Sequence, residues 1–324
     1  MKKSDPEVTL LPEGGENPLA VVARVLANEW NIWIIRQALA GARRFTQWKD
    51  AGDISNAALT AGLRDLTEVG IFRREPYQLR PERHEYVLTR RGISTWPILV
   101  WILDWEQTWS AAPPADPGLV HLTCGEPVRP ELRCRACSGP VVGRDMSMIV
   151  GPTGGWDRSI PDVTSKRRAR EGWTRRELPE TMTLIGDRWS WAVLGASFRG
   201  VTRYSEFTQF LGGTAPTISE RLKSFCDIGV LVAVPDEDRP GWFDYRLTTK
   251  GRAFLPVVLT SVEWGQQHFR SPEGKALLLR HETCKKSLSL STVCTTCDVP
   301  VDFATLRLGE SGPPTRSGPA RAAH

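Results

Sequence analysis

Apolar residues recur at helical spacing from residue 19 to residue 26, which predicts a first helix. Residues 30–39 are nearly all apolar and predict a second, buried helix, which ends at Gly41. Thr46, and Ser205 at the corresponding place later in the chain, stand where an N-cap is expected. A short third helix is therefore expected to open there.

The pattern continues with another helix, a hairpin and a last helix. Ser55 is expected to cap a fourth helix, whose apolar residues fall every three or four positions until Gly70 stops it. Residues 71–74 and 85–88 predict two strands joined by a polar loop that contains proline. Thr89 is then expected to cap one long helix rich in tryptophan and leucine. The predicted order is four helices, a hairpin and a helix.

The chain contains an internal repeat. After a shift of 159 positions, residues 30–105 match residues 189–264 without a gap, and 14 of the 76 positions are identical. Six of the identities are glycine or proline, which constrain the path of the backbone. We therefore expect two copies of one mainly α domain with a small β hairpin, an α+β fold.

Both copies carry the same set of short motifs. The first motif is Arg-Phe-Thr at 44–46 and Arg-Tyr-Ser at 203–205. The second is Leu-Arg-x-Leu-x3-Gly at 63–70. The third, at 85–92 and 244–251, is an acidic residue followed by Tyr-x-Leu-Thr-x2-Gly. This set resembles the HxlR family of bacterial transcription regulators, within the MarR-like group. The resemblance implies tandem winged helix-turn-helix domains that bind double-stranded DNA. It also implies dimers paired through their first and last helices.

In a winged helix-turn-helix, a short helix, a turn and a second helix form the reading head. The start of the second helix contacts base edges, and nearby cations bind phosphates. Gly62 departs from the family, which usually has arginine there, and residues 236–238 make the second wing acidic. The expected DNA contacts of the first copy are Arg44, Ser55, Asn56, Ala57, Thr60, Arg64, Arg73, Arg74, Arg80 and Arg83. Those of the second copy are Arg203, Thr214, Thr217, Ser219, Arg221, Lys223 and Arg239, beside Glu220.

Six of the seven cysteines and two histidines form twin patterns of His-x2-Cys-x9-Cys-x2-Cys, offset by 160 residues. Four such ligands make a closed, structural Cys3His zinc site, so each domain is expected to be followed by a small zinc knuckle. Redox-active thiols and clusters without metal remain alternatives. The two expected ligand sets are His121, Cys124, Cys134 and Cys137, and His281, Cys284, Cys294 and Cys297.

Charge adds little to this picture. The formal net charge is +5, yet residues 1–115 carry 14 basic and 14 acidic side chains, so a DNA-binding face must come from local clustering. Residues 166–176 hold six cations, which form either a DNA-binding arm or a solvated linker. The chain starts without a secretory signal, and its most apolar stretch, residues 96–103, is too short for a membrane span. We expect a cytoplasmic protein with no membrane partner.

The expected function is sequence-specific regulation of transcription, with repression as the output. The chain would work as an intramolecular pseudo-dimer or a homodimer, with an unknown small-molecule effector. The alternatives are a winged-helix module that binds protein and a zinc-thiolate redox regulator; no grouping of residues suggests an enzyme. The expected divisions are a flexible start (1–16), domains at 17–112 and 177–272, knuckles at 116–145 and 278–305, a basic linker (146–176) and a disordered tail (306–324).

Overall fold

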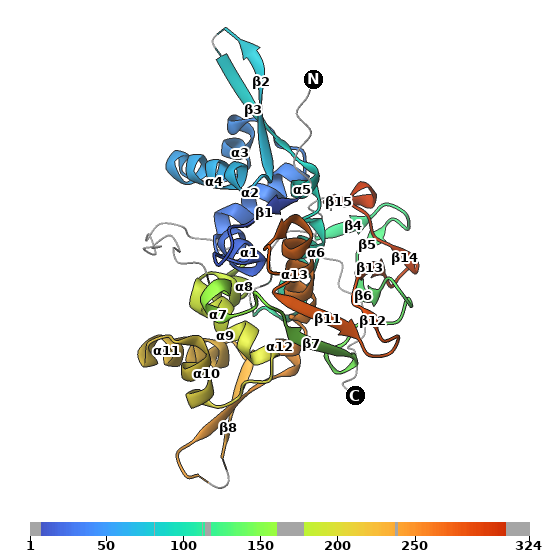
Figure 1. Ribbon diagram of the computed structural model, residues 1–324. Helices are drawn as coiled ribbons and strands as arrows, with labels where there is room; N and C mark the ends of the chain where they lie inside the picture. Colours follow the sequence, from blue (N-terminus) through green and yellow to red (C-terminus); the bar gives the residue numbers. More distant parts are fainter. Residues whose placement is uncertain are drawn as a thin grey trace.

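A computed structural model describes residues 8–80, 82–111, 113, 118–160, 178–236 and 239–308. The basic stretch 166–176, Glu237 and Asp238 of the second wing, and residues 309–324 of the expected tail lie outside the described residues. We refer to residues 8–160 as the first half and to residues 178–308 as the second half. Figure 1 shows the two halves meeting along the helices α6 (Trp96–Trp109) and α13 (Leu255–His268).

Each half begins with the predicted winged helix-turn-helix order, with the last helix divided in two. In the first half the elements are α1 (Pro18–Leu26), α2 (Glu29–Leu39), α3 (Phe45–Ala51), α4 (Asn56–Glu68), β2 (Phe72–Leu79), β3 (Glu82–Leu88), α5 (Arg90–Ile93) and α6 (Trp96–Trp109). In the second half they are α8 (Pro179–Ile185), α9 (Arg188–Phe198), α10 (Tyr204–Leu211), α11 (Ala215–Asp227), β8 (Leu231–Pro235), β9 (Phe243–Leu247), α12 (Thr249–Arg252) and α13 (Leu255–His268).

Local interactions explain these boundaries. Ser55 Oγ accepts a hydrogen bond from the backbone N–H of Ala58, 3.1 Å away, which confirms it as the cap of α4. Gly41 and Gly70 adopt φ of 109° and 81° just after α2 and α4, a backbone region that favours glycine. Leu59, Leu63 and Leu66 of α4 are fully buried against the rest of the domain.

Three details of the predicted elements are wrong. Neither Thr46 nor Ser205 is an N-cap: Arg44 and Arg203 hold that position, and the side chains of Gln47 and Glu206 accept hydrogen bonds from the N–H groups that precede α3 and α10. Thr89 caps only the short helix α5, because the chain turns before Pro97 restarts it as α6. The first wing is also longer than predicted, with a register shift near Pro76.

The sheets beyond the two domains are built by strands from both halves. β7 (Met146–Val150) pairs with β11 (Leu277–His281), and β15 (Leu306–Leu308) pairs with β4 (Leu119–His121). β6 (Pro130–Cys134) pairs antiparallel with β13 (Leu290–Cys294). Because partner residues hold equivalent places in the repeat, these pairings describe a local twofold arrangement in which the halves exchange strands.

Shorter elements complete this region. Several elements fall in segments expected to lack structure. β1 (Thr9–Leu10) lies in the expected flexible start, β7 and α7 (Trp156–Ser159) lie in the expected linker, and β15 lies in the expected tail. These segments are short and only partly apolar, so their order depends on pairing with the other half. The remaining elements are β1 (Thr9–Leu10), β5 (Glu126–Pro127), η1 (Gly143–Asp145), α7 (Trp156–Ser159), β10 (Phe269–Arg270), β12 (Lys286–Ser287), β14 (Val299–Pro300) and η2 (Phe303–Thr305).

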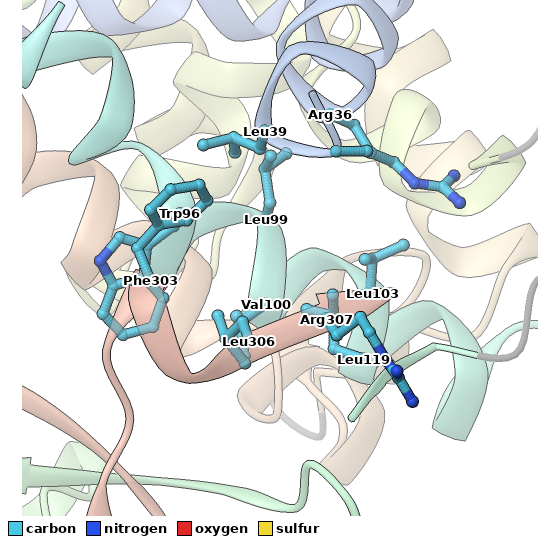
Figure 2. A pocket seen from close by; sticks show the side chains of 11 residues that line it. Arg36, Leu39, Trp96, Leu99, Val100, Leu103, Leu119, Phe303, Leu306 and Arg307 are labelled. Atoms are coloured by element: carbon cyan, nitrogen blue, oxygen red, sulfur yellow. The ribbon is translucent and has the colours of Figure 1, made fainter. Parts of the chain in front are cut away.

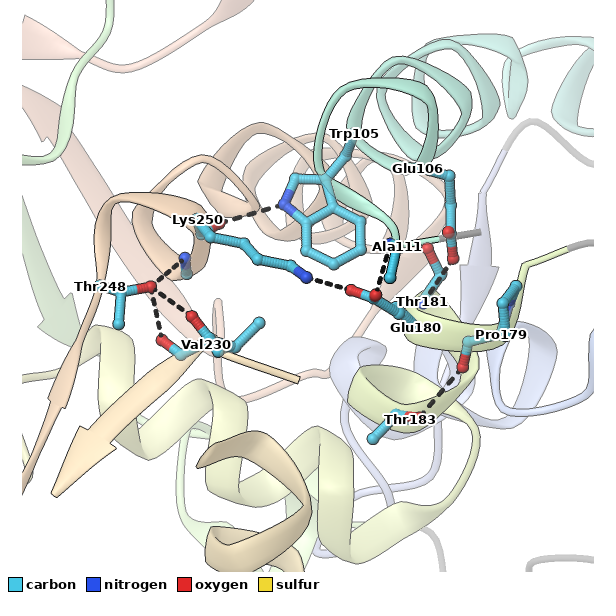
Figure 3. A network of polar contacts seen from close by, with 12 residues as sticks. Trp105, Glu106, Ala111, Pro179, Glu180, Thr181, Thr183, Val230, Thr248 and Lys250 are labelled. Atoms are coloured by element: carbon cyan, nitrogen blue, oxygen red, sulfur yellow. Dashed lines mark hydrogen bonds and ion pairs between the residues drawn. The ribbon is translucent and has the colours of Figure 1, made fainter. Parts of the chain in front are cut away.

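The last helices form a reciprocal interface. Trp105 Nε1 donates to the carbonyl oxygen of Lys250 at 3.1 Å, and the equivalent Trp264 donates to the carbonyl oxygen of Arg91 at 3.2 Å. Lys250 also forms an ion pair with Glu180, whose carboxylate accepts from the backbone N–H of Ala111 (Figure 3). Each half therefore anchors a buried indole on the backbone of the other half.

The first helices also cross between the halves. Gly265 of α13 lies so close to α1 that a Cβ there would fall 2.5 Å from Val22. On the opposite side of the interface, the buried carboxylate of Glu106 on α6 accepts a hydrogen bond of 2.6 Å from the backbone N–H of Thr181 on α8. Each first helix thus packs beside the last helix of the other half, as the resemblance implied for two separate chains.

Candidate nucleic-acid interface and metal centres

The first recognition helix, α4, presents a short polar surface at its start. Ser55, Asn56, Ala57 and Thr60 are all exposed there, next to the N-terminus of the helix. Arg64 is exposed one turn further along, but its guanidinium lies 3.0 Å from Asp65 and 3.9 Å from Glu68. DNA would therefore have to compete with two carboxylates for Arg64, whereas the side chains at the helix start are open.

Gly62 has a packing role that explains its departure from the family. A Cβ at this position would lie 2.5 Å from Ile34 Cδ1 of α2, so glycine lets the recognition helix approach α2 closely. The equivalent residue in the second half is Arg221, which pairs at 3.2 Å with Asp187, the N-cap of α9. In the first half that N-cap is the neutral Asn28. The cap and the helix residue thus differ together: a charged pair in one half and a neutral pair in the other.

This placement changes the expectation for Arg221. Its side chain is only 26% exposed and lies between Asp187 and Glu220, so it holds the start of α9 in place. Other residues of α11 face outward: Ser219, Glu220 and Lys223 are exposed, while Thr214 and Thr217 join their hydroxyls at 2.8 Å. The second recognition surface is therefore a threonine–serine patch with Lys223 as its open cation.

A cation–π contact joins the first wing to the start of α3. The guanidinium of Arg44 lies 4.3 Å from the ring centroid of Tyr77, which sequence reasoning did not single out because one tyrosine in a hairpin gives no signal of its own. Arg73 pairs with Glu75 at 2.6 Å, and Arg74 contacts His84 Nδ1 at 3.0 Å. Arg80 and Arg83 are exposed near the tip.

The second wing has a different surface. Arg239 lies near Asp236 at 3.8 Å and over the ring of Trp242 at 5.7 Å. Val232, Trp242 and Phe243 are each nearly half exposed. Arg203 is exposed at the start of α10, as Arg44 is in the first half. Figure 1 shows the two wings at opposite ends of the molecule, with α4 and α11 on the side away from the exchanged sheets.

The eight cysteine and histidine side chains expected as ligands do come together, but not in the expected sets. His121 and Cys124 of the first knuckle meet Cys294 and Cys297 of the second. Cys134 and Cys137 of the first meet His281 and Cys284 of the second. Each knuckle was expected to close on its own ion, and that grouping is wrong. The physical reason is the antiparallel pairing of β6 with β13, which carries each Cys-x2-Cys turn to the His-x2-Cys turn of the other half.

The distances within the crossed clusters fit a tetrahedral zinc site. With Zn–S about 2.3 Å and Zn–N about 2.0–2.1 Å, ligand atoms should lie about 3.8 Å apart for two sulfurs and about 3.6 Å for sulfur and nitrogen. Cys134 Sγ and Cys284 Sγ are 3.9 Å apart. His281 Nδ1 lies 3.5 Å from Cys284 Sγ and 3.3 Å from Cys137 Sγ. His121 Nδ1 lies 3.6 Å from Cys124 Sγ and 3.3 Å from Cys297 Sγ.

The surroundings of the clusters also suit a metal. His281 Nε2 lies 3.3 Å from the carbonyl oxygen of Pro140, a contact that fixes the ring with Nδ1 toward the thiols. A hydrogen bond from the backbone N–H of Lys286 lowers the pKa of the Cys284 thiol to about 7. Burial raises the pKa of Cys294, but backbone N–H groups led by that of Thr296 outweigh it and lower the pKa to about 6. Both shifts favour the thiolate, the form that binds metal, whereas the pKa values of Cys137 and Cys297 are raised.

Comparison with known proteins agrees with the geometry. The profile of the HxlR-like helix-turn-helix family matches residues 25–113 and 184–273, more than half of the chain. The chain belongs to this family. Its two winged domains are therefore those of DNA-binding transcription regulators.

Two sequence relatives are named as HTH-type transcriptional regulators. An uncharacterized HTH-type transcriptional regulator of Mycobacterium bovis, Mb3122, is 34% identical over 116 residues, which cover 36% of this chain and 73% of the relative. The Synechocystis regulator sll1512 is 39% identical over 84 residues, covering 26% of this chain and 62% of its own length. The crystal structure of PA1607, described as a candidate transcription factor, is 30% identical with a TM-score of 0.36 and covers 40% of this chain and 93% of that one.

No helix in the described part of the chain is both long and apolar enough to cross a bilayer.

Proposed function

We propose that this HxlR-family regulator reads one operator with both of its domains, as a dimer contained in a single chain. The observation that carries the proposal is the reciprocal interface, in which Trp105 and Trp264 each bond to the other half and α1 packs on α13. Family members of one domain would need two chains to bring two heads to a duplex. Here both heads lie on one side of one molecule (Figure 1).

The two heads differ, so the operator is expected to have two unlike half-sites. The first wing offers Arg80 and Arg83 to phosphates or a narrow minor groove, whereas the described part of the second wing balances Arg239 with Asp236. At the helix starts, Asn56 can bond both groups on the edge of adenine, while the second head offers threonine hydroxyls. We propose repression as the output, in which the molecule lying along both half-sites excludes other proteins from that DNA.

We further propose that each crossed cluster holds one structural zinc ion. Four ligands leave no open position for catalysis, so the metal would supply rigidity. Each ion would join a His-x2-Cys turn of one half to a Cys-x2-Cys turn of the other, so the two ions would hold the halves together. The spacing of the two heads would then depend on metal.

The test is selection of bound duplexes from a random pool, followed by titration of the winning duplex at several salt concentrations. A DNA reader loses affinity steeply with salt, with a slope of log K against log salt of about −0.9 for each phosphate contact. Arg83→Ala should reduce the slope by about one contact. Arg280→Ala, on β11 among the exchanged sheets, is the matched control and should leave it unchanged. Selection that enriches no sequence would contradict the proposal.

A second candidate role applies to the second wing alone. Its exposed Val232, Trp242 and Phe243 favour contact with a protein surface more than with phosphates. If the second wing binds protein, Trp242→Ala should leave the affinity and the salt slope for the selected duplex unchanged, whereas loss of affinity would assign the wing to DNA.

A further inference from the structure

Strand β7 is an open edge of its sheet. β11 pairs with it on one side, and no described strand pairs with it on the other. The N–H of Gly151 donates to the carbonyl oxygen of Ala276 at 2.9 Å, and bonded pairs alternate with non-bonded pairs along an antiparallel ladder. The N–H and carbonyl groups of Met146, Met148 and Val150 therefore point away from β11. Within the described part of the chain, these groups have no hydrogen-bond partner.

The composition of β7 leaves this edge unguarded. Proteins commonly protect an edge strand with a lysine, a proline or a bulge. β7 reads Met-Ser-Met-Ile-Val, and its register with β11 has no shift. Ile149 and its partner across the ladder, Leu278, are 59% and 45% exposed on one face of the sheet. Such an edge can accept a further strand from another protein.

A cleft of about 990 Å³ lies beside β7. Met146, Met148 and Val150, which share one face of the strand, line it on one side. The second winged domain lines it on the other side, with Arg252 of α12 and Leu255 of α13. The cleft therefore leaves space for side chains that an added strand would carry on this face.

The equivalent place in the first half is smaller. The cavity beside β15 has a volume of about 270 Å³. Trp96 and Phe303 stand there in place of Leu255 and Gly143, and Figure 2 shows both among the side chains that line it. Since β15 is also the edge of its sheet, it serves as a matched comparison, an edge strand without the large cleft.

The cations of the cleft indicate the charge of what it binds. The described residues that line it include the three arginines Arg144, Arg199 and Arg252, and no aspartate or glutamate. Arg144 lies 3.8 Å from Asp145, yet its side chain is 87% exposed and open to a second carboxylate. Arg199 lies over the ring of Trp156 at 5.0 Å, and Arg252 is exposed. A cleft with this lining attracts carboxylates.

We propose that β7 binds an extended, acidic segment of a partner protein as an added strand. Successive side chains of a strand point to opposite faces, so alternate residues of the segment would face the arginines of the cleft and the others would lie beside Ile149. The chain's own residues 166–176 hold six cations, and a second copy would bring another Arg144, so charge favours neither as the occupant. Through β7 the regulator would hold a partner beside its second head, a consequence that rests on the proposed function.

The test measures the fluorescence anisotropy of a labelled peptide mixed with the full chain, purified with zinc and free of DNA. The peptide has about eight residues, alternately valine and glutamate. It should bind, and it should bind at least about tenfold more weakly when lysine replaces glutamate or when its backbone amides are N-methylated. These peptide controls leave the protein itself unchanged.

Protein variants locate the binding edge. Met148→Pro removes one outward N–H without removing a bond to β11, so it should leave the sheet folded and weaken binding at least about fivefold, or about 1 kcal/mol. Leu308→Pro makes the same change on β15 and should not weaken binding. Arg144→Glu should weaken binding about threefold, whereas Arg307→Glu on β15 should not.

The docking edge is ruled out if the wild type binds no peptide at millimolar concentration, if N-methylation has no effect, or if Met148→Pro and Leu308→Pro weaken binding equally. Addition of the selected duplex should leave the peptide bound, and displacement would assign the cleft to DNA and overturn the protein partner. A chain that binds the duplex but no peptide would leave the proposed function standing.

Discussion

The crossed grouping of the ligands predicts how many zinc ions each cysteine variant binds. Single substitutions Cys124→Ser, Cys137→Ser and Cys297→Ser each remove one ligand from one cluster. Cys124 and Cys297 share a cluster, whereas Cys124 and Cys137 belong to different clusters although they are neighbours in sequence. The double variants therefore separate crossed sites from two self-contained knuckles.

The expected numbers follow from the grouping. The wild type should hold two zinc ions, and each single variant should hold one. Cys124→Ser with Cys297→Ser should still hold one, because both changes damage the same site, while Cys124→Ser with Cys137→Ser should hold none. A complete structural site binds zinc with an apparent free energy of about 10–16 kcal/mol, which is enough to retain the ion through a wash with a weak chelator.

The assay is elemental analysis of washed, purified protein by plasma mass spectrometry, with protein content from amino-acid analysis. Cys226→Ser is the matched control, since Cys226 lies on α11 outside both clusters, and it should keep two ions. The reverse result for the two doubles, none for Cys124/Cys297 and one for Cys124/Cys137, would show self-contained knuckles. That outcome would refute the exchange of strands and the crossed grouping of the zinc ligands.

Three further predictions test the interface and the heads. Trp105→Phe and Trp264→Phe each remove a hydrogen bond to the other half and should each lower the free energy of unfolding in urea by about 1 kcal/mol, whereas the exposed Trp242→Phe should leave it unchanged. Burial raises the pKa of Glu106 above 4.5, so its ionised form destabilises the fold. Glu106→Gln should therefore raise the melting temperature at pH 7, and this gain should shrink as the pH falls through the raised pKa toward 4.5; a gain that grows with acid would contradict the sign. Arg221→Ala should lower the melting temperature by removing the Asp187 pair, while Lys223→Ala should leave it unchanged and reduce the salt slope for DNA by about 0.9; loss of the slope only in Arg221→Ala would reverse their roles.

Most of the domain fold could be predicted from sequence because its signals are local. Helical spacing, Ser55 as a cap, and Gly41 and Gly70 as stops each act within a few residues, and the repeat supplied a second example of every element. The error at the start of α3 was also local, because the cap was expected at Thr46 and lies at Arg44. Arg44 became the cap of α3 because Gln47, three residues later, could accept from its N–H group.

The grouping of the ligands could not be predicted from sequence for a different reason. Identical spacing in both knuckles means that either turn can complete either site, so spacing alone does not distinguish self-contained from crossed clusters. The choice depends on the pairing of β6 with β13, which is a contact between the halves. The same dependence on the other half explains why β7 and β15, short strands in segments that read as linker and tail, were missed.

Arg221 shows a similar limit within the DNA-binding surface. Its position on the recognition helix made it a natural candidate for DNA contact. The structure places Arg221 against Asp187. In the first half the equivalent residues are Asn28 and Gly62, so the charged pair of one half is replaced by two neutral residues in the other. The residues at the helix starts and the wing arginines Arg80 and Arg83 remain predictions for DNA contact.

The central claim is that one chain supplies both heads to one operator. Native mass spectrometry of the full chain with the selected duplex, at protein concentrations above and below that of the DNA, measures this directly. The account predicts a complex of one chain, two zinc ions and one duplex that is already complete at equimolar ratio, with a selected site whose two halves differ. A complex that requires two chains per duplex on a symmetric site would contradict it.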